Sequence, residues 1–189
     1  MKQVKWTEWV PRDAEDGTVL MQDMMDCLPG AQPGEVSRIV RLFENPESPV
    51  ALPGAISLPR HDCVHIVLGR GLLPQDEAFV IGFTMGTSKK IGPLSRRLFG
   101  LISKYLYPKY YKFSDEHLQI FDLGLEYGKM SKVDQIYEFP FEDYMHQTVG
   151  EIRDRLGLDM AQLLKCYREE VAMIPNSKES KRLQEWVKL

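Results

Sequence analysis

Residues 58–86, LPRHDCVHIVLGRGLLPQDEAFVIGFTMG, decide the fold because they predict two helices joined by a short turn. Pro59 is tolerated in the first turn of a helix, and the apolar residues after it favour a first helix over about 58–68. Glycine and proline within 69–74 indicate a turn, followed by a second helix over about 74–87. A connection this short places two helices side by side, so we expect an antiparallel pair.

The same stretch contains four residues with metal-ligand chemistry, His61, Asp62, His65 and Glu77, in the pattern H-D-x-x-H-(x11)-E. His61 and His65 are one helical turn apart, so both imidazoles leave the same face, with Asp62 beside them. Residue 71 is midway between His65 and Glu77, and in an antiparallel pair residues equidistant from the turn lie at about the same height. Glu77 is therefore predicted to face His65 across the gap between the helices.

Two imidazoles and two carboxylates suit Zn, Fe(II) or Mn, and zinc is our first choice. The alternative is that the histidines are satisfied core residues and that the acidic side chains merely favour the first turn of a helix. Cys63 falls between the ligands in sequence, but a helix turns it about 200° away from His61, which indicates packing. With Cys27 and Cys166 it makes an odd number of cysteines without CxxC spacing, which favours free thiols over disulfides.

The rest of the chain predicts an all-α protein, a single-domain multi-helix bundle over residues 1–189. Hydrophobic residues make up 43% of the chain and charged residues 27%, as in globular proteins. An irregular N-terminal arm is expected over 1–12, and a C-terminal helix or tail over 175–189. Apolar periodicity and capping residues predict further helices at about 14–27, 34–43, 93–106, 115–130, 148–157 and 159–173.

Residues 89–112 form a basic region with a cluster of tyrosines. Seven lysines and arginines lie between Ala78 and Ser114, and this interval contains no Asp or Glu. Such a basic, aromatic helix suits the surface of a membrane, because lysines meet anionic headgroups while aromatic rings settle at the water boundary. An ordinary core helix with one solvated face is the alternative. Nucleic acid is not expected as a partner, because the remainder of the chain is acidic.

The segment LPRHDCVHIVLGRG at 58–71, followed by Asp-Glu-Ala at 76–78, resembles the Coq-four family of ubiquinone (coenzyme Q) biosynthesis proteins, whose signature is HDxxH-(x11)-E. GLEYGK at 124–129 and TVGEIRDRLGL at 148–158 are similar to later helices of that family. The region of resemblance spans about residues 55–158.

The resemblance implies a mostly helical fold, a divalent metal held by His61, Asp62, His65 and Glu77, and a groove for a polyprenylated aromatic intermediate. It further implies a ubiquinone biosynthesis protein that removes the ring carboxylate at C1 of a polyprenylated hydroxybenzoate and replaces it by hydroxyl. The alternative that it implies is a non-catalytic scaffold that binds an isoprenoid lipid and organises other ubiquinone biosynthesis proteins at a membrane.

For an enzyme of this kind, a lyase, we expect the catalytic side chains to be Glu77 and Arg60, since the Arg60 guanidinium matches the shape of a substrate carboxylate. A solvated residue at the helix start is the alternative for Arg60. A soluble metal phosphohydrolase is a third class and has the least support. The absence of a signal-peptide apolar run predicts a bacterial cytoplasmic protein, peripheral on the inner membrane. A homodimer is left open.

Overall fold

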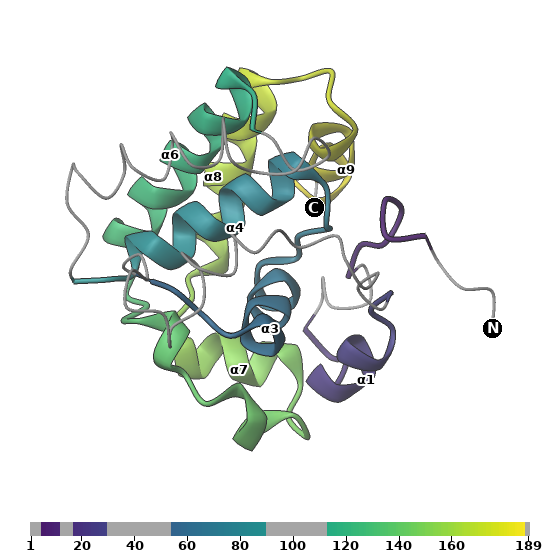
Figure 1. The fold of residues 1–189 in the computed structure, drawn as a ribbon, viewed down its shortest axis with the longest axis vertical. Coiled ribbons are helices and arrows are strands. Elements are labelled where there is room, and N and C mark those ends of the chain that lie inside the picture. The colour runs from purple at the N-terminus through teal and green to yellow at the C-terminus, as the bar shows by residue number, and fades with distance from the viewer. Residues whose placement is uncertain (1–4, 12–16, 30–53, 90–112, 188–189) are drawn as a thin grey trace.

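The computed structural model describes residues 5–11, 17–29, 54–89 and 113–187, and the regular structure in these ranges is helical, with no β-sheet (Figure 1). The described elements are α1 (Met21–Asp26), α3 (Leu58–Leu68), α4 (Pro74–Gly86), α6 (Asp115–Met130), η3 (Ile136–Glu138), η4 (Phe141–Tyr144), α7 (Val149–Leu156), α8 (Met160–Met173) and α9 (Lys178–Trp186). The all-α prediction is confirmed, and the metal motif lies on α3 and α4, which pack on one another.

Helix α3 is central in the structure. All residues from Cys63 to Leu68 are buried, so this part of the helix is covered on every side, and α1, α4 and α7 contact the helix. The helix ends at Gly69, whose φ of 69° places it in the left-handed region that glycine adopts without strain. A side chain there would also overlap the indole ring of Trp186 in α9. The turn between α3 and α4 therefore requires glycine for two reasons.

Helices α4 and α6 lie against each other along their length and form the closest helix pair of the described fold (Figure 1). Gly82 and Gly86 of α4 face Gly124 and Gly128 of α6. A Cβ at any of the four would overlap a backbone carbonyl oxygen of the other helix, so only glycine permits this approach. We call this contact of the four glycines the α4–α6 seam. The seam sets the position of α4, whose first turn contains Glu77.

The prediction that a helix begins at about residue 14 is wrong, because the helix begins later in the structure. Residues 17–20 are not helical, and α1 begins at Met21. Gly17 has a φ of 77°, and the backbone after it pairs with the start of α7: Val149 N–H donates to the Val19 carbonyl at 2.9 Å, and Met21 N–H donates to the Gln147 carbonyl at 3.0 Å. Backbone groups used in this pairing are not available for helical hydrogen bonds.

The C-terminal helices follow their predicted boundaries. Thr148 and Glu151 form a capping box at the start of α7, which ends at Gly157 with a φ of 69°. The Asp159 side chain caps α8 by accepting hydrogen bonds from the N–H groups of Ala161 and Gln162. Helix α9 packs on α8, and Trp186 is buried, so the C-terminal segment is docked rather than a free tail.

The predicted helices at 34–43 and 93–106, and all of the basic region 89–112 except Lys89, lie outside the described residues. Lys89 itself is exposed and pairs with Asp134, with 2.6 Å between Nζ and the carboxylate. None of the helices in the described part of the chain combines the length and apolar character needed to cross a membrane.

Candidate metal centre

Three of the four predicted ligands meet at one point. His61 and His65 leave the same face of α3, and their Nε2 atoms are 3.1 Å apart. Glu77, in the first turn of α4, places Oε2 at 3.1 Å from His61 Nε2 and Oε1 at 3.3 Å from His65 Nε2. The spacing of the motif along two helices therefore brings together the side chains that it was predicted to bring together.

The spacing of these donor atoms fits a first-row divalent cation. Zinc binds imidazole nitrogen at about 2.0–2.1 Å, so two ligands of a tetrahedral ion are about 3.3–3.4 Å apart. The two Nε2 atoms are 3.1 Å apart, and each has one Glu77 oxygen at a similar distance, Oε2 at 3.1 Å from His61 and Oε1 at 3.3 Å from His65, so these distances are close to that value. All three side chains offer atoms within 4.8 Å of one another. The residues present therefore fit the metal that the motif predicts.

The orientation of His65 is determined by the turn after α3. Its Nδ1 lies 2.7 Å from the backbone carbonyl oxygen of Gly71, and the side chain is fully buried. A carbonyl only accepts hydrogen bonds, so Nδ1 must carry the proton. In the neutral imidazole the Nε2 lone pair then points toward Glu77 and His61, as metal-binding histidines require.

The charge balance of the cluster favours an ionised glutamate. Burial raises the pKa of the Glu77 carboxyl, but the charges of His65 and His61 and their hydrogen bonds outweigh this effect, and the pKa lies well below its ordinary value. The Glu77 side chain is 19% exposed and that of His61 is 17% exposed, so the cluster opens toward solvent on one side. When the two histidines are neutral, their Nε2 lone pairs beside the ionised carboxylate would suit a divalent cation, which would take the place of the protons that otherwise join these groups.

Asp62, the fourth predicted ligand, is not part of this group of three. Its carboxyl group is half-buried and close enough to interact electrostatically with His61, His65 and Glu77. Burial raises the pKa of this carboxyl, while the charges of the two histidines lower it. Asp62 therefore stands beside the three converging donors, and the structure does not place its oxygens among them.

Arg60, the predicted carboxylate anchor, is engaged by another residue. Its guanidinium pairs with the exposed carboxylate of Glu142 in η4, and Nη1 donates to the Tyr137 carbonyl at 3.3 Å. The hydrogen bonds that the guanidinium donates to Glu142 raise its pKa. The two remaining histidines are elsewhere: His117 takes part in the capping box of α6, and His146 is exposed before α7.

The sequence did not reveal the groups that hold the turn. Arg70 is fully buried between the rings of Phe79 and Tyr167, at 3.9 and 4.1 Å from their centroids, and it pairs with Glu170 of α8. Nothing in a local pattern predicts the burial of an arginine against a partner a hundred residues away. The Gly71 carbonyl was also missed as a partner of His65, although the glycine itself marked the turn.

Comparisons with protein-family models, with curated proteins and with solved structures find no match to this chain.

Proposed function

We propose that this protein binds a divalent cation, zinc by first choice, through His61, His65 and Glu77, and that it belongs to the Coq-four family. The reaction proposed is removal of the ring carboxylate at C1 of a polyprenylated hydroxybenzoate and its replacement by hydroxyl. The single observation that supports the cation site is the convergence of three side chains, in which the two Nε2 atoms and the two Glu77 carboxylate oxygens make contacts of 3.1–3.3 Å. The reaction itself is supported by the sequence motif alone.

The number of ligands favours catalysis over a purely structural metal. Catalytic zinc sites have three protein ligands and one position open to water or substrate, whereas structural sites have four. Three protein donors meet here, and two of them are partly exposed to solvent. A substrate carboxylate would therefore have a route to a position that the described residues leave open.

Each side chain has a defined part in this proposal. A bound cation supplies a Lewis acid for the ring carboxylate and the adjacent phenolate oxygen. Glu77 brings negative charge to the site, and the buried His65 presents its lone pair in a fixed direction. Arg60 lies one residue before His61 in the chain. It would exchange its present partner, Glu142, for the substrate carboxylate. The carbon–carbon bond would break with loss of CO2, water would supply the hydroxyl, and the two electrons released would pass to dioxygen, which becomes hydrogen peroxide, or to an external oxidising cofactor.

Asp62 decides between this function and the scaffold. If its carboxylate completed the ligand set, four protein donors would close the site and the metal would be structural, as expected of a non-catalytic isoprenoid-binding scaffold. The observation that keeps this second function in consideration is the electrostatic interaction of Asp62 with the three converging residues. Asp62→Asn separates the two: it should leave zinc affinity nearly unchanged at an open site and lower it strongly at a closed one.

Zinc titration by calorimetry tests the site. We expect one ion per chain for the native protein. Glu77→Gln should lower the zinc affinity by at least about 100-fold, because removing a residue that only hydrogen-bonds to a metal ligand already costs about 10–100-fold. His146→Ala is the matched control, since that histidine is exposed and outside the cluster. Equal affinity in Glu77→Gln and native protein would reject the site.

Turnover tests the reaction. Release of CO2 from a polyprenylated hydroxybenzoate, in the presence of dioxygen, should depend on Glu77 and be unaffected by His146→Ala. Release at the same rate in the native protein and in Glu77→Gln would remove the catalytic metal. Zinc binding without any release would favour the scaffold.

We also propose that residues 89–112 dock on an anionic membrane surface, beside partner enzymes that supply the prenylated lipid. The seven positive charges of this part of the chain support the proposal. Flotation with vesicles that contain anionic lipid should decrease in the double variant Lys104→Glu, Lys109→Glu. Unchanged recovery with the vesicles would count against docking through this region.

A further inference from the structure

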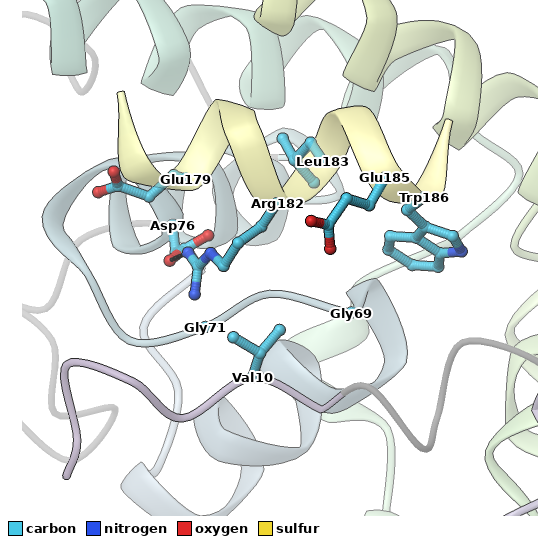
Figure 2. A pocket seen from close by; sticks show the side chains of 9 residues that line it. All are labelled: Val10, Gly69, Gly71, Asp76, Glu179, Arg182, Leu183, Glu185 and Trp186. Atoms are coloured by element: carbon cyan, nitrogen blue, oxygen red, sulfur yellow. Dashed lines mark hydrogen bonds and ion pairs between the residues drawn. The ribbon is translucent and has the colours of Figure 1, made fainter. Parts of the chain in front are cut away.

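An ionic network lies directly behind the turn that carries the Gly71 carbonyl. The Asp76 carboxylate, which is 2% exposed, pairs with Arg182 of α9 and lies 3.7 Å from Arg70. It also accepts a hydrogen bond of 3.3 Å from Leu73 N–H, which closes the start of α4. Figure 2 shows the Arg182 side chain reaching from α9 to Asp76 beside the turn that contains Gly71. A residue near the C-terminus thus helps to hold a turn more than a hundred positions earlier.

This network touches the group that orients His65. A Cβ at Gly71 would collide with Arg182 Nη1 and lie 3.0 Å from Asp76 Oδ2, so both charged groups lie against the Gly71 backbone. The carbonyl of this same residue accepts the His65 Nδ1 hydrogen bond at 2.7 Å. Displacing Arg182 or Asp76 therefore allows the Gly71 peptide to move, and with it the histidine ring.

The other ligand is held from the same side. Gln75 is buried and donates from Nε2 to Glu170 of α8 at 2.6 Å and to the Ser180 hydroxyl of α9 at 3.1 Å. Gln75 and Asp76 immediately precede Glu77, so the two residues before this ligand are both tied to the C-terminal helices. The α8–α9 pair therefore supports both Glu77 and the turn beside His65.

The pairing of Arg182 is incomplete in a way that stability alone does not explain. Its Nε and Nη1 atoms are buried and have no hydrogen-bond partner among the residues that the structure describes. Leaving such a group unsatisfied is costly, and buried groups of this kind call for an explanation. An arginine placed to position the turn provides one.

We propose that Asp76 and Arg182 are positioning residues of the metal centre, and that docking of α9 and binding of the cation are coupled through the Gly71 carbonyl. This inference rests on the proposed cation site and adds its regulation by the C-terminal helix. Mutation of residues that hydrogen-bond to metal-binding histidines typically lowers metal affinity by about 10–100-fold. Because coupling between two equilibria is reciprocal, the cation must stabilise the docked α9 by the same factor.

Titration with Co2+, followed by its visible absorption, measures both affinity and ligand geometry. We expect the Kd for Co2+ to rise at least about 10-fold in Arg182→Gln, with a changed absorption spectrum. Arg182→Lys keeps a cation beside Asp76 and should recover part of the affinity. Lys181→Gln is the matched control, because Lys181 is the exposed neighbour on the same helix, and it should bind like the native protein.

Hydrogen exchange of the α9 amides measures the reverse effect. Addition of Co2+ should slow exchange across Ser180–Trp186 in the native protein and in Lys181→Gln, and should slow it less in Arg182→Gln. If Arg182→Gln does not fold, Asp76→Asn provides the same comparison with a side chain of the same size that still accepts from Leu73.

The outcomes separate this inference from the proposed function. If the native protein binds neither Co2+ nor Zn2+, the cation site is rejected and this inference falls with it. If the native protein binds and folded Arg182→Gln or Asp76→Asn binds with the same Kd and spectrum, the coupling is rejected while the cation site stands. Cation binding without a change in α9 exchange would also overturn the coupling.

Discussion

Replacing Gly82 by alanine tests the close approach of α4 and α6. At an exposed helix position this change stabilises a protein by up to about 1 kcal/mol, because alanine is the better helix former. Here the added Cβ would overlap the carbonyl oxygen of Phe121, which belongs to rigid helix backbone and cannot rotate away. The sign of the effect should therefore be reversed.

The size of the effect follows from the packing of the seam. To restore van der Waals contact, the helices must separate locally by about 1 Å, and a gap of that size forfeits up to about half of each neighbouring contact energy. Overpacking of this kind costs about 3 kcal/mol at the upper end of its usual range, and the gain in helix propensity offsets about 1 kcal/mol. We expect Gly82→Ala to lower the free energy of unfolding by about 2 kcal/mol, which corresponds to a decrease of about 4–8 °C in Tm for a chain of this size.

Thermal and urea unfolding followed by circular dichroism, in the presence of a chelator, give this free energy without a contribution from metal. Gln119→Ala is the matched control, since Gln119 is exposed on α6 and should change stability by less than about 0.5 kcal/mol. A Gly82→Ala protein as stable as the native one, or more stable, would refute the backbone contact between α4 and α6.

Two further predictions concern thiols and pH. Cys27 is exposed, whereas Cys63 and Cys166 are buried. Burial raises the pKa of each of these two thiols to about 12. A maleimide at pH 8 should therefore label only Cys27 of the native protein. The hydrogen bond from Thr148 N–H lowers the pKa of Glu151 in the folded protein. The ionised carboxylate therefore stabilises the fold at pH values above about 4.3, the ordinary pKa of a glutamate in the unfolded chain. This stabilisation is lost as the pH falls through the lowered pKa of the folded state. The difference in urea midpoint between native protein and Glu151→Gln should therefore be present at pH 7 and disappear in acid.

The thiol and pH predictions each have a control experiment. Denatured protein should react at all three cysteines, and rapid labelling of Cys166 in the folded state would contradict its burial. Glu169→Gln, an exposed position on α8, should show no loss of stability at pH 7. A Glu151→Gln effect that stayed constant from pH 7 to pH 3 would show that the capping hydrogen bond does not depend on the ionised carboxylate.

Local chemistry made much of the fold predictable. The boundaries of α3, α6 and α8 agree with the expected ones, because capping side chains and terminal glycines act within one turn of the residues they mark. The His61, His65 and Glu77 cluster was predictable for a similar reason: one helical turn separates the histidines, and a short connection brings the glutamate back beside them. Gly82 and Gly86 are four residues apart on α4, a spacing that allows another helix to approach closely, and α6 does so.

Long-range pairing could not be predicted from the chain alone. The sequence placed Asp62 among the ligands from its neighbourhood, but the group of three converging side chains does not include it. Arg60 was assigned to a substrate, and the fold gives it Glu142. The start of α1 depends on backbone pairing with residues near 148, which no local pattern encodes.

The same distinction applies to the candidate site as a whole. Residue types and spacing along the chain specify which donors can share an ion, because helix geometry repeats every few residues. The proton on His65, the buried Arg70 and the contact of Arg182 with the Gly71 turn depend on segments that are distant in sequence and meet only on folding. Hydrogen bonds and ion pairs between such segments have no sequence period, so their partners are known only when the helices are packed.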